Sequence, residues 1–131
     1  MYRWVDHTAE VELEIEADSE EEVLAEALRA LAELLGASAG GPGAERRAVR
    51  VSTDDRPALL AAWLEELVFL AESEGFVATE IEALELSADD ARATVRGVLA
   101  DPPPLVKAVT YHRLQFDATG RGYRAVVVLD V

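Results

Sequence analysis

Residues 11–35 read VELEIEADSEEEVLAEALRALAELL, and this stretch contains the pattern that decides the fold. Over residues 11–17, apolar side chains alternate with glutamates, which predicts a strand with one buried and one solvated face. Ser19 followed by Glu22 then matches a capping box, a sequence signature of a helix N-terminus. The apolar residues that follow recur at helical spacing, so we expect a helix over residues 20–35. A half-buried strand therefore runs directly into an amphipathic helix.

The rest of the chain extends this pattern into an α+β fold. Apolar residues at helical spacing predict a second helix from Asp54 or Asp55 to Gly75. Further strands are expected over about 48–52, 76–86, 91–100, 106–116 and 122–130. The element order is then β-α-β-α-β-β-β-β, with two helices packed on one face of a largely antiparallel sheet. We expect a single domain over residues 1–131, in which residues 36–45, rich in glycine, form a flexible loop.

The alternation in the first predicted strand also shows on which face of the strand its charged residues lie. Glu12, Glu14 and Glu16 all fall on the same face of that strand. We interpret that face as solvated and these three glutamates as solubilising groups.

Composition and charge exclude several function classes. The formal net charge is −14, from 26 acidic and 12 basic side chains, and such a surface repels a phosphate backbone. We therefore expect no direct nucleic-acid binding, whereas metal cations or a basic protein partner would suit the charge. The absence of cysteine excludes disulfides and thiolate nucleophiles. No signal peptide and no apolar run of about 20 residues is visible, so we expect a cytoplasmic protein without a membrane segment.

The residues that could carry chemistry are few. The two histidines are His7 and His112, and no serine lies in a G-x-S-x-G frame. The sequence also contains no P-loop and no H-E-x-x-H motif. The chain is therefore expected to act as an accessory protein rather than as an enzyme.

Three carboxylates near the chain ends lack a simple structural explanation. Asp6 and Glu10 flank a His-Thr-Ala turn, and Asp130 ends a strongly apolar strand where a charge is out of pattern. The carboxylate of Val131, the last residue, would lie beside Asp130. If the last strand neighbours the first, hard oxygen ligands converge there and suit Ca²⁺, Mg²⁺ or Mn²⁺.

Four segments together resemble the archease family, and the resemblance covers essentially the whole chain. These segments are Asp6-His7-Thr8-Ala9-Glu10, Trp63-Leu64-Glu65-Glu66-Leu67, Lys107-Ala108-Val109-Thr110-Tyr111-His112 and Leu129-Asp130-Val131. The third segment is the most specific, and it contains the only lysine of the chain.

The resemblance implies a metal-binding accessory protein of the RtcB-type RNA ligase that acts in tRNA splicing. The implied role is to speed guanylylation of the ligase and to restore its multiple turnover. The implied metal ligands are Glu10, Asp130 and Val131, with Lys107 as a functional polar residue nearby. Asp6, His7 and His112 lie in the same motifs and are further candidates. The family usually has aspartate where this chain has Glu10, and the extra methylene changes the reach of the ligand.

Two other functions compete with the RNA-ligase activator. The first is a chaperone-like modulator of a tRNA-modifying enzyme such as a methyltransferase, which needs an interaction surface instead of a metal site. The second is a stand-alone metal-dependent hydrolase, for which the carboxylates, a histidine and a lysine would be the raw material. No nucleophile–base motif supports this hydrolase.

Overall fold

The computed structural model describes residues 1–37 and 45–131, which form two helices and seven strands. The helices are α1 (Glu20–Leu34) and α2 (Arg56–Glu74). The strands are β1 (Tyr2–His7), β2 (Glu10–Ala17), β3 (Glu45–Ser52), β4 (Phe76–Leu86), β5 (Asp90–Leu99), β6 (Ala108–Thr119) and β7 (Gly122–Asp130).

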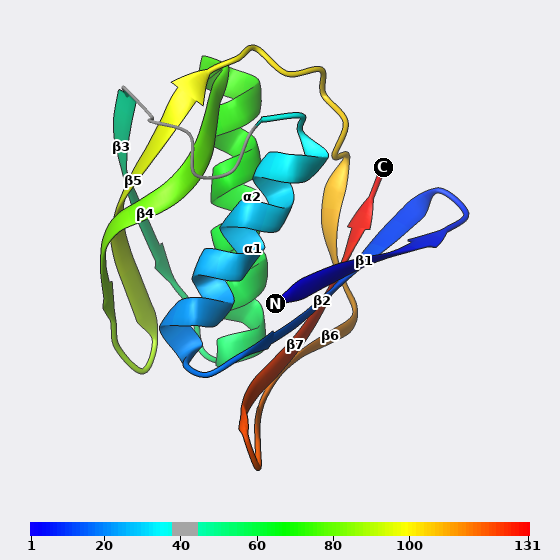
Figure 1. Ribbon diagram of the computed structural model, residues 1–131, viewed down its shortest axis with the longest axis vertical. Helices are drawn as coiled ribbons and strands as arrows, with labels where there is room; N and C mark the ends of the chain where they lie inside the picture. The colour runs from blue at the N-terminus through cyan, green and yellow to red at the C-terminus, as the bar shows by residue number, and fades with distance from the viewer. Residues whose placement is uncertain (38–44) are drawn as a thin grey trace.

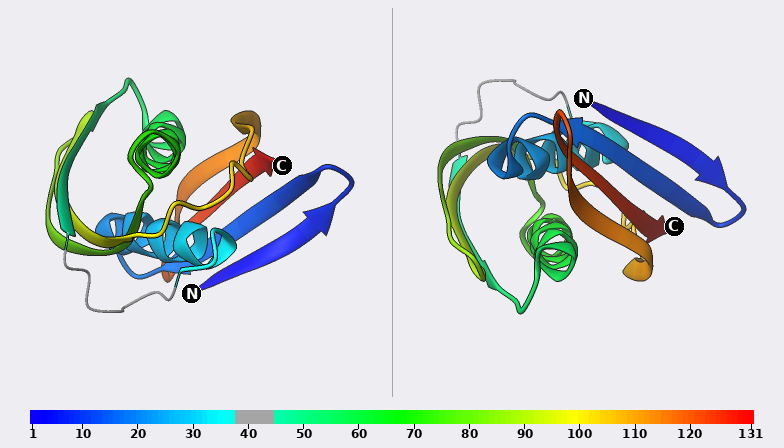
Figure 2. Two further views of the ribbon diagram at one scale, coloured as in Figure 1. Left: turned by 90° about the horizontal axis from the view of Figure 1, so that it is seen from above. Right: turned by 90° about the horizontal axis from the view of Figure 1, so that it is seen from below.

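The strands form two antiparallel sheets with the helices between them. One sheet has the order β1-β2-β7-β6 and the other has the order β3-β5-β4. Figure 2 shows both helices enclosed by the sheets, and α1 contacts both β2 and β4 while α2 contacts both β6 and β4. The predicted α+β class, the two helices, the antiparallel pairing and the order of the predicted elements are confirmed. The division of the strands into two sheets was not predicted.

The structure adds the N-terminal strand β1, for which the sequence analysis assigned no element. β1 is an edge strand that pairs only with β2 among the described residues. The turn that joins them contains Ala9 at φ 60°, a left-handed conformation that hairpins usually give to glycine or asparagine. A turn is predicted over His7-Thr8-Ala9, but Thr8-Ala9 carries no hairpin signal of that kind, so the strand before the turn is not predicted. Figure 1 shows the resulting hairpin of β1 and β2.

The helix ends are formed by the residues that the sequence pattern indicates. The Ser19 hydroxyl accepts a hydrogen bond from the Glu22 amide at 3.1 Å and caps α1. Asp55 Oδ1 accepts one from the Ala58 amide at 2.8 Å and caps α2. Gly75 then ends α2 at φ 67°.

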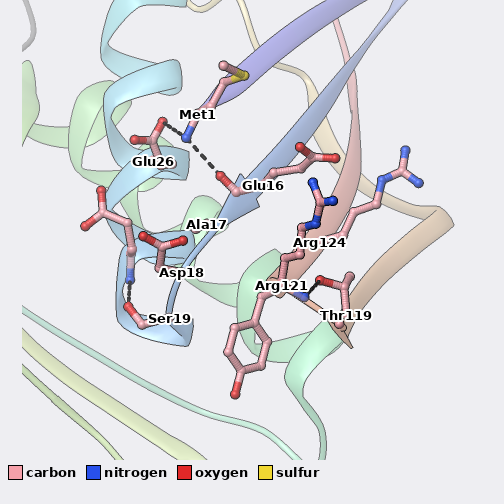
Figure 3. A pocket seen from close by; sticks show the side chains of 12 residues that line it. Met1, Glu16, Ala17, Asp18, Ser19, Glu26, Thr119, Arg121 and Arg124 are labelled. Carbon is pink, nitrogen blue, oxygen red and sulfur yellow. Dashed lines mark hydrogen bonds and ion pairs between the residues drawn. The ribbon is translucent and has the colours of Figure 1, made fainter.

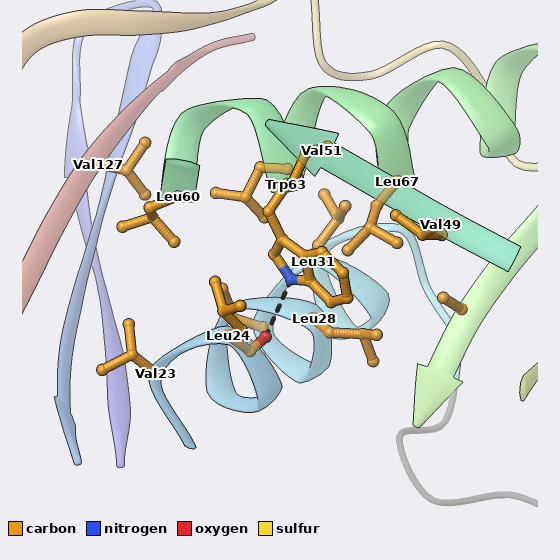
Figure 4. Packing of buried hydrophobic residues seen from close by; sticks show 14 of the residues in the cluster. Val23, Leu24, Leu28, Leu31, Val49, Val51, Leu60, Trp63, Leu67 and Val127 are labelled. Carbon is orange, nitrogen blue, oxygen red and sulfur yellow. Dashed lines mark hydrogen bonds between the residues drawn. The ribbon is translucent and has the colours of Figure 1, made fainter. Parts of the chain in front are cut away.

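The core lies between the two sheets and around the helices. Trp63 of α2 is fully buried, and its Nε1 donates a hydrogen bond to the Leu24 carbonyl of α1 at 3.0 Å (Figure 4). Leu13 of β2 and Val127 of β7 enter the same cluster from the four-stranded sheet, and Val49 enters it from the other sheet. One continuous core therefore fixes both sheets relative to the helices.

Some predicted boundaries differ from the structure. β3 begins at Glu45 instead of 48, and β6 begins at Ala108 instead of 106. Of the predicted flexible loop over 36–45, Glu45 belongs to β3, while residues 38–44 lie outside the described residues. Within the described ranges, no helix is both long and apolar enough to cross a membrane.

Candidate functional site

The two predicted carboxylate ligands lie opposite each other at one end of the four-stranded sheet. Glu10 of β2 is the cross-strand partner of Asp130 of β7, and on its other side Glu10 faces His7 of β1. Residues directly opposite in an antiparallel ladder point to the same face, with Cβ atoms about 4.5–5.5 Å apart. The fold therefore brings His7, Glu10 and Asp130 together in one row, although they come from the two ends of the chain.

Main-chain hydrogen bonds hold the end of the chain against this row. The Val131 amide donates to the Ala9 carbonyl at 3.2 Å, so the last residue lies against the β1–β2 turn. The Lys107 amide donates to the Asp130 carbonyl at 2.7 Å. Figure 1 shows the C-terminus beside the β1–β2 hairpin. The peptide group between Asp130 and Val131 is thus hydrogen-bonded on both sides, to Ala9 and to Lys107.

Asp6 and Lys107 lie at the same end of the sheet, but not on the face that carries His7, Glu10 and Asp130. Asp6 pairs with Val11, and alternation along β1 places its side chain on the opposite face from His7. Lys107 precedes the first residue of β6 and lines a groove against α2 together with Glu65 and other residues. Lys107 contacts Asp130 through its main chain, and Asp6 is the chain neighbour of His7 on β1.

His112 lies in an irregular part of β6. The β6–β7 register shifts between Thr110 and Gln115, so the residues between them leave the regular ladder. The His112 side chain is exposed, and it makes no hydrogen bond or ion pair with any other described residue. No contact in the structure joins it to the Glu10–Asp130 row.

The interpretation of Glu12 as a solvated residue is wrong. Glu12 is only 7% exposed, and its carboxylate forms an ion pair with Arg113. Val126 and Val128 lie on the same sheet face as Glu12 and are also buried, so this face is partly covered although alternation predicts it to be wet.

Arg113 is the functional candidate that sequence reasoning missed. It lies in the irregular segment of β6 at φ 59°, and its Nη2 approaches His7 Nε2 at 3.4 Å. The Nε2 of His7 is 3.8 Å from Glu12 Oε1. Arg113, Glu12 and His7 therefore form a cluster beside the Glu10–Asp130 row. No periodic signal marks this cluster, because it depends on the departure of β6 from strand geometry.

The donor set of the row fits a hard divalent cation. Carboxylate oxygens from Glu10 and Asp130, with the terminal carboxylate of Val131, are the ligand types that Ca²⁺, Mg²⁺ and Mn²⁺ prefer. Among residues 1–37 and 45–131, no group of three or more histidine, aspartate or glutamate side chains is placed to hold a metal. The family resemblance names Val131 as the third ligand beside Glu10 and Asp130, and this ligand set stays a prediction.

A separate open pocket of about 970 Å³ lies at the opposite end of the same sheet. It is lined by residues from the start of the chain, the β2–α1 junction and the β6–β7 hairpin (Figure 3). The Met1 ammonium there contacts Glu26 at 3.3 Å and donates to the Glu16 carbonyl at 2.9 Å. None of the site residues predicted from the sequence lines this pocket.

The fold and the site define a class of small α+β protein in which two antiparallel sheets enclose two helices. The carboxylates of Glu10 and Asp130, from the two ends of the chain, lie opposite each other in one sheet. The sequence model of the Archease protein family matches residues 2–131, and the chain belongs to this family. It is 31% identical to the protein archease of Archaeoglobus fulgidus, over 99% of this chain and 98% of that protein. It is also 31% identical to the protein archease of Methanopyrus kandleri, over 97% and 96% of the two chains.

Two solved structures share the fold. The solution structure of a Methanobacterium thermoautotrophicum protein matches with a TM-score of 0.81 and 26% identity, over 99% of this chain and 98% of that one. The crystal structure of a Thermotoga maritima archease, described as a possible chaperone, matches with a TM-score of 0.70 and 24% identity. The latter covers 100% of this chain and 98% of that chain, and at this identity it shows the fold alone.

Proposed function

We propose that this protein is a cytoplasmic, metal-binding accessory protein of an RtcB-type RNA ligase. In this role it promotes guanylylation and multiple turnover of the ligase during tRNA splicing and RNA repair, and it has no catalytic activity of its own. The observation that carries the proposal is the pairing of Glu10 with Asp130, because it juxtaposes the two carboxylates that the family resemblance names as ligands. Membership of the Archease protein family over residues 2–131 supports the same role.

The residues that would hold the metal are Glu10, Asp130 and Val131. A bound divalent cation supplies concentrated positive charge on a protein whose formal net charge is −14. The chain positions the ligands through its main chain, since the Val131 amide bonds to the Ala9 carbonyl and the Lys107 amide to the Asp130 carbonyl.

Guanylylation of the ligase by GTP, with and without this protein, tests the proposal. We expect the wild type to accelerate adduct formation and Asp130→Ala to abolish the acceleration while the circular dichroism spectrum stays unchanged. Asp117→Ala is the matched control, because Asp117 is an exposed aspartate on β6, near the other end of the same sheet. Loss of stimulation in both variants would show that the effect is not specific to the proposed ligands.

Calcium titration calorimetry of the protein alone tests the metal site without the ligase. We expect one site for the wild type and none for Asp130→Ala. Stimulation of the ligase that survives both chelation and Asp130→Ala would contradict the metal-dependent role. That result would favour the chaperone-like modulator instead.

A further inference from the structure

Two exposed aromatic side chains lie on adjoining elements of the surface, Phe69 on α2 and Tyr111 on β6. In the described part of the chain, the exposed large hydrophobic residues are Met1, Phe69, Leu99, Leu105 and Tyr111. Phe69 of α2 is 58% exposed, and Tyr111 of β6 is 62% exposed. The Tyr111 hydroxyl donates to Glu65 of α2 at 3.4 Å, so the two aromatic residues belong to adjoining elements. Exposed aromatic residues gathered in this way are typical of a protein interaction surface.

A groove of about 380 Å³ lies between α2 and the start of β6. Phe69 and Val68 line it from α2, while Val109 and the Lys107 segment line it from the β6 side. Leu105, which is 40% exposed, immediately precedes the part of the chain that forms the groove wall. The Lys107 segment that lines the groove is bonded to the candidate site through its main chain, since the Lys107 amide donates to the Asp130 carbonyl.

The α2 side of the groove carries two carboxylates, and Lys107 is the one basic residue among the described residues that line the groove. Glu65 and Glu72 lie four residues before and three residues after Phe69, so α2 presents all three on one face. Neither carboxylate forms an ion pair with another described residue, whereas Arg47 neutralises the neighbouring Glu74. Burial and the negative charge of Glu65 raise the pKa of Tyr111, which reflects the same acidic surroundings.

We infer that this groove is the docking surface for the ligase, and that it binds a ligase segment with an apolar anchor flanked by arginine or lysine. The inference rests on the proposed function. The anchor would lie against Phe69 and Val68, and the basic side chains would pair with Glu65 and Glu72. Charge complementarity selects this occupant, because the groove presents two carboxylates against the one ammonium of Lys107, and the whole protein has a net charge of −14, so an acidic segment is repelled.

The test is the dissociation constant for the purified RtcB-type ligase from the same organism. We expect Phe69→Ala to weaken binding about tenfold or more, as truncation of an aromatic anchor does. Glu72→Lys should weaken it about fivefold or more, and this loss should shrink as salt screens the charge. Glu85→Lys is the matched control, since Glu85 is exposed on β4 of the other sheet and the charge change is the same. The affinity of the Glu85→Lys variant for the ligase should stay within about twofold of wild type.

The readouts separate docking from metal function. At saturating protein, Phe69→Ala should recover full stimulation of guanylylation, whereas Asp130→Ala should bind the ligase and stimulate nothing. Wild-type stimulation combined with unchanged affinity in Phe69→Ala and Glu72→Lys would overturn the groove assignment alone. A wild type that neither binds nor stimulates the ligase would overturn the proposed function as well. If Phe69→Ala instead dissolved a dimer seen by sedimentation, with ligase affinity unchanged, a second copy would be the occupant and the inference would be wrong.

Discussion

Replacing Arg113 by alanine should destabilise the protein, because it leaves the Glu12 carboxylate charged and buried. The Glu12 side chain is 9% exposed and that of Arg113 is 46% exposed. His7 would remain beside Glu12 after the substitution, with its Nε2 3.8 Å from Glu12 Oε1. Breaking a fully buried ion pair costs about 3–5 kcal/mol, and an exposed pair contributes about 0–1 kcal/mol. Since one partner here is half-exposed, we expect a loss of about 2 kcal/mol.

Urea unfolding followed by circular dichroism measures this loss as a lower midpoint at an unchanged slope. Arg3→Ala is the control, because the Arg3–Glu14 pair lies on the same sheet face, with Arg3 71% exposed, and its loss should be much smaller. Glu12→Gln should rescue Arg113→Ala, with a coupling of about 1 kcal/mol in the double-mutant cycle. Equal losses for Arg113→Ala and Arg3→Ala, or strict additivity in the cycle, would refute the argument from burial.

Three further predictions follow from local geometry. Ala9→Gly should raise the free energy of unfolding by about 1 kcal/mol in thermal melts, because Ala9 adopts φ 60°. Burial, together with a hydrogen bond to Glu33, raises the pKa of Tyr2 to about 12. In the folded protein, Tyr2 therefore keeps its phenol proton at pH values above the usual pKa of 10.0. The stability that this contributes is present below pH 10 and is lost as the pH rises to about 12. Glu33→Gln should lower this pKa in an ultraviolet titration. Glu10→Asp should tighten calcium binding about fivefold in titration calorimetry, because one rotatable bond fewer is frozen.

The parts of the fold that were predictable are those in which local periodicity decides the outcome. The switch from alternation to helical spacing within residues 11–35 located β2 and α1, and the capping oxygens of Ser19 and Asp55 located the helix starts. The division into two sheets was not predictable, since alternation shows that a strand has two faces but not which strand pairs with it.

The two carboxylates of the candidate site could be named from the sequence, and their role as metal ligands stays a prediction, whereas their buried neighbours could not be named. Glu10 and Asp130 stood out as charges against the hydrophobic pattern, and the resemblance linked the two chain ends. Glu12 and Arg113 carried no such signal. Alternation assigns Glu12 to a wet face, and its burial depends on a register shift in β6 that arises from tertiary contacts.

The register of β7 explains how the fold keeps the carboxylates of the candidate site together. β7 is apolar on both faces from Ala125 to Leu129, so its own pattern does not select which face Asp130 occupies. The selection is made at the other end of the strand, where Gly122 has φ 148° and a Cβ would approach the Ala17 carbonyl oxygen at 2.4 Å. Only glycine permits that close approach, so it fixes β7 against the end of β2. The β2–β7 ladder then runs without a bulge to Glu10 and Asp130, and it transmits this register to the candidate metal site.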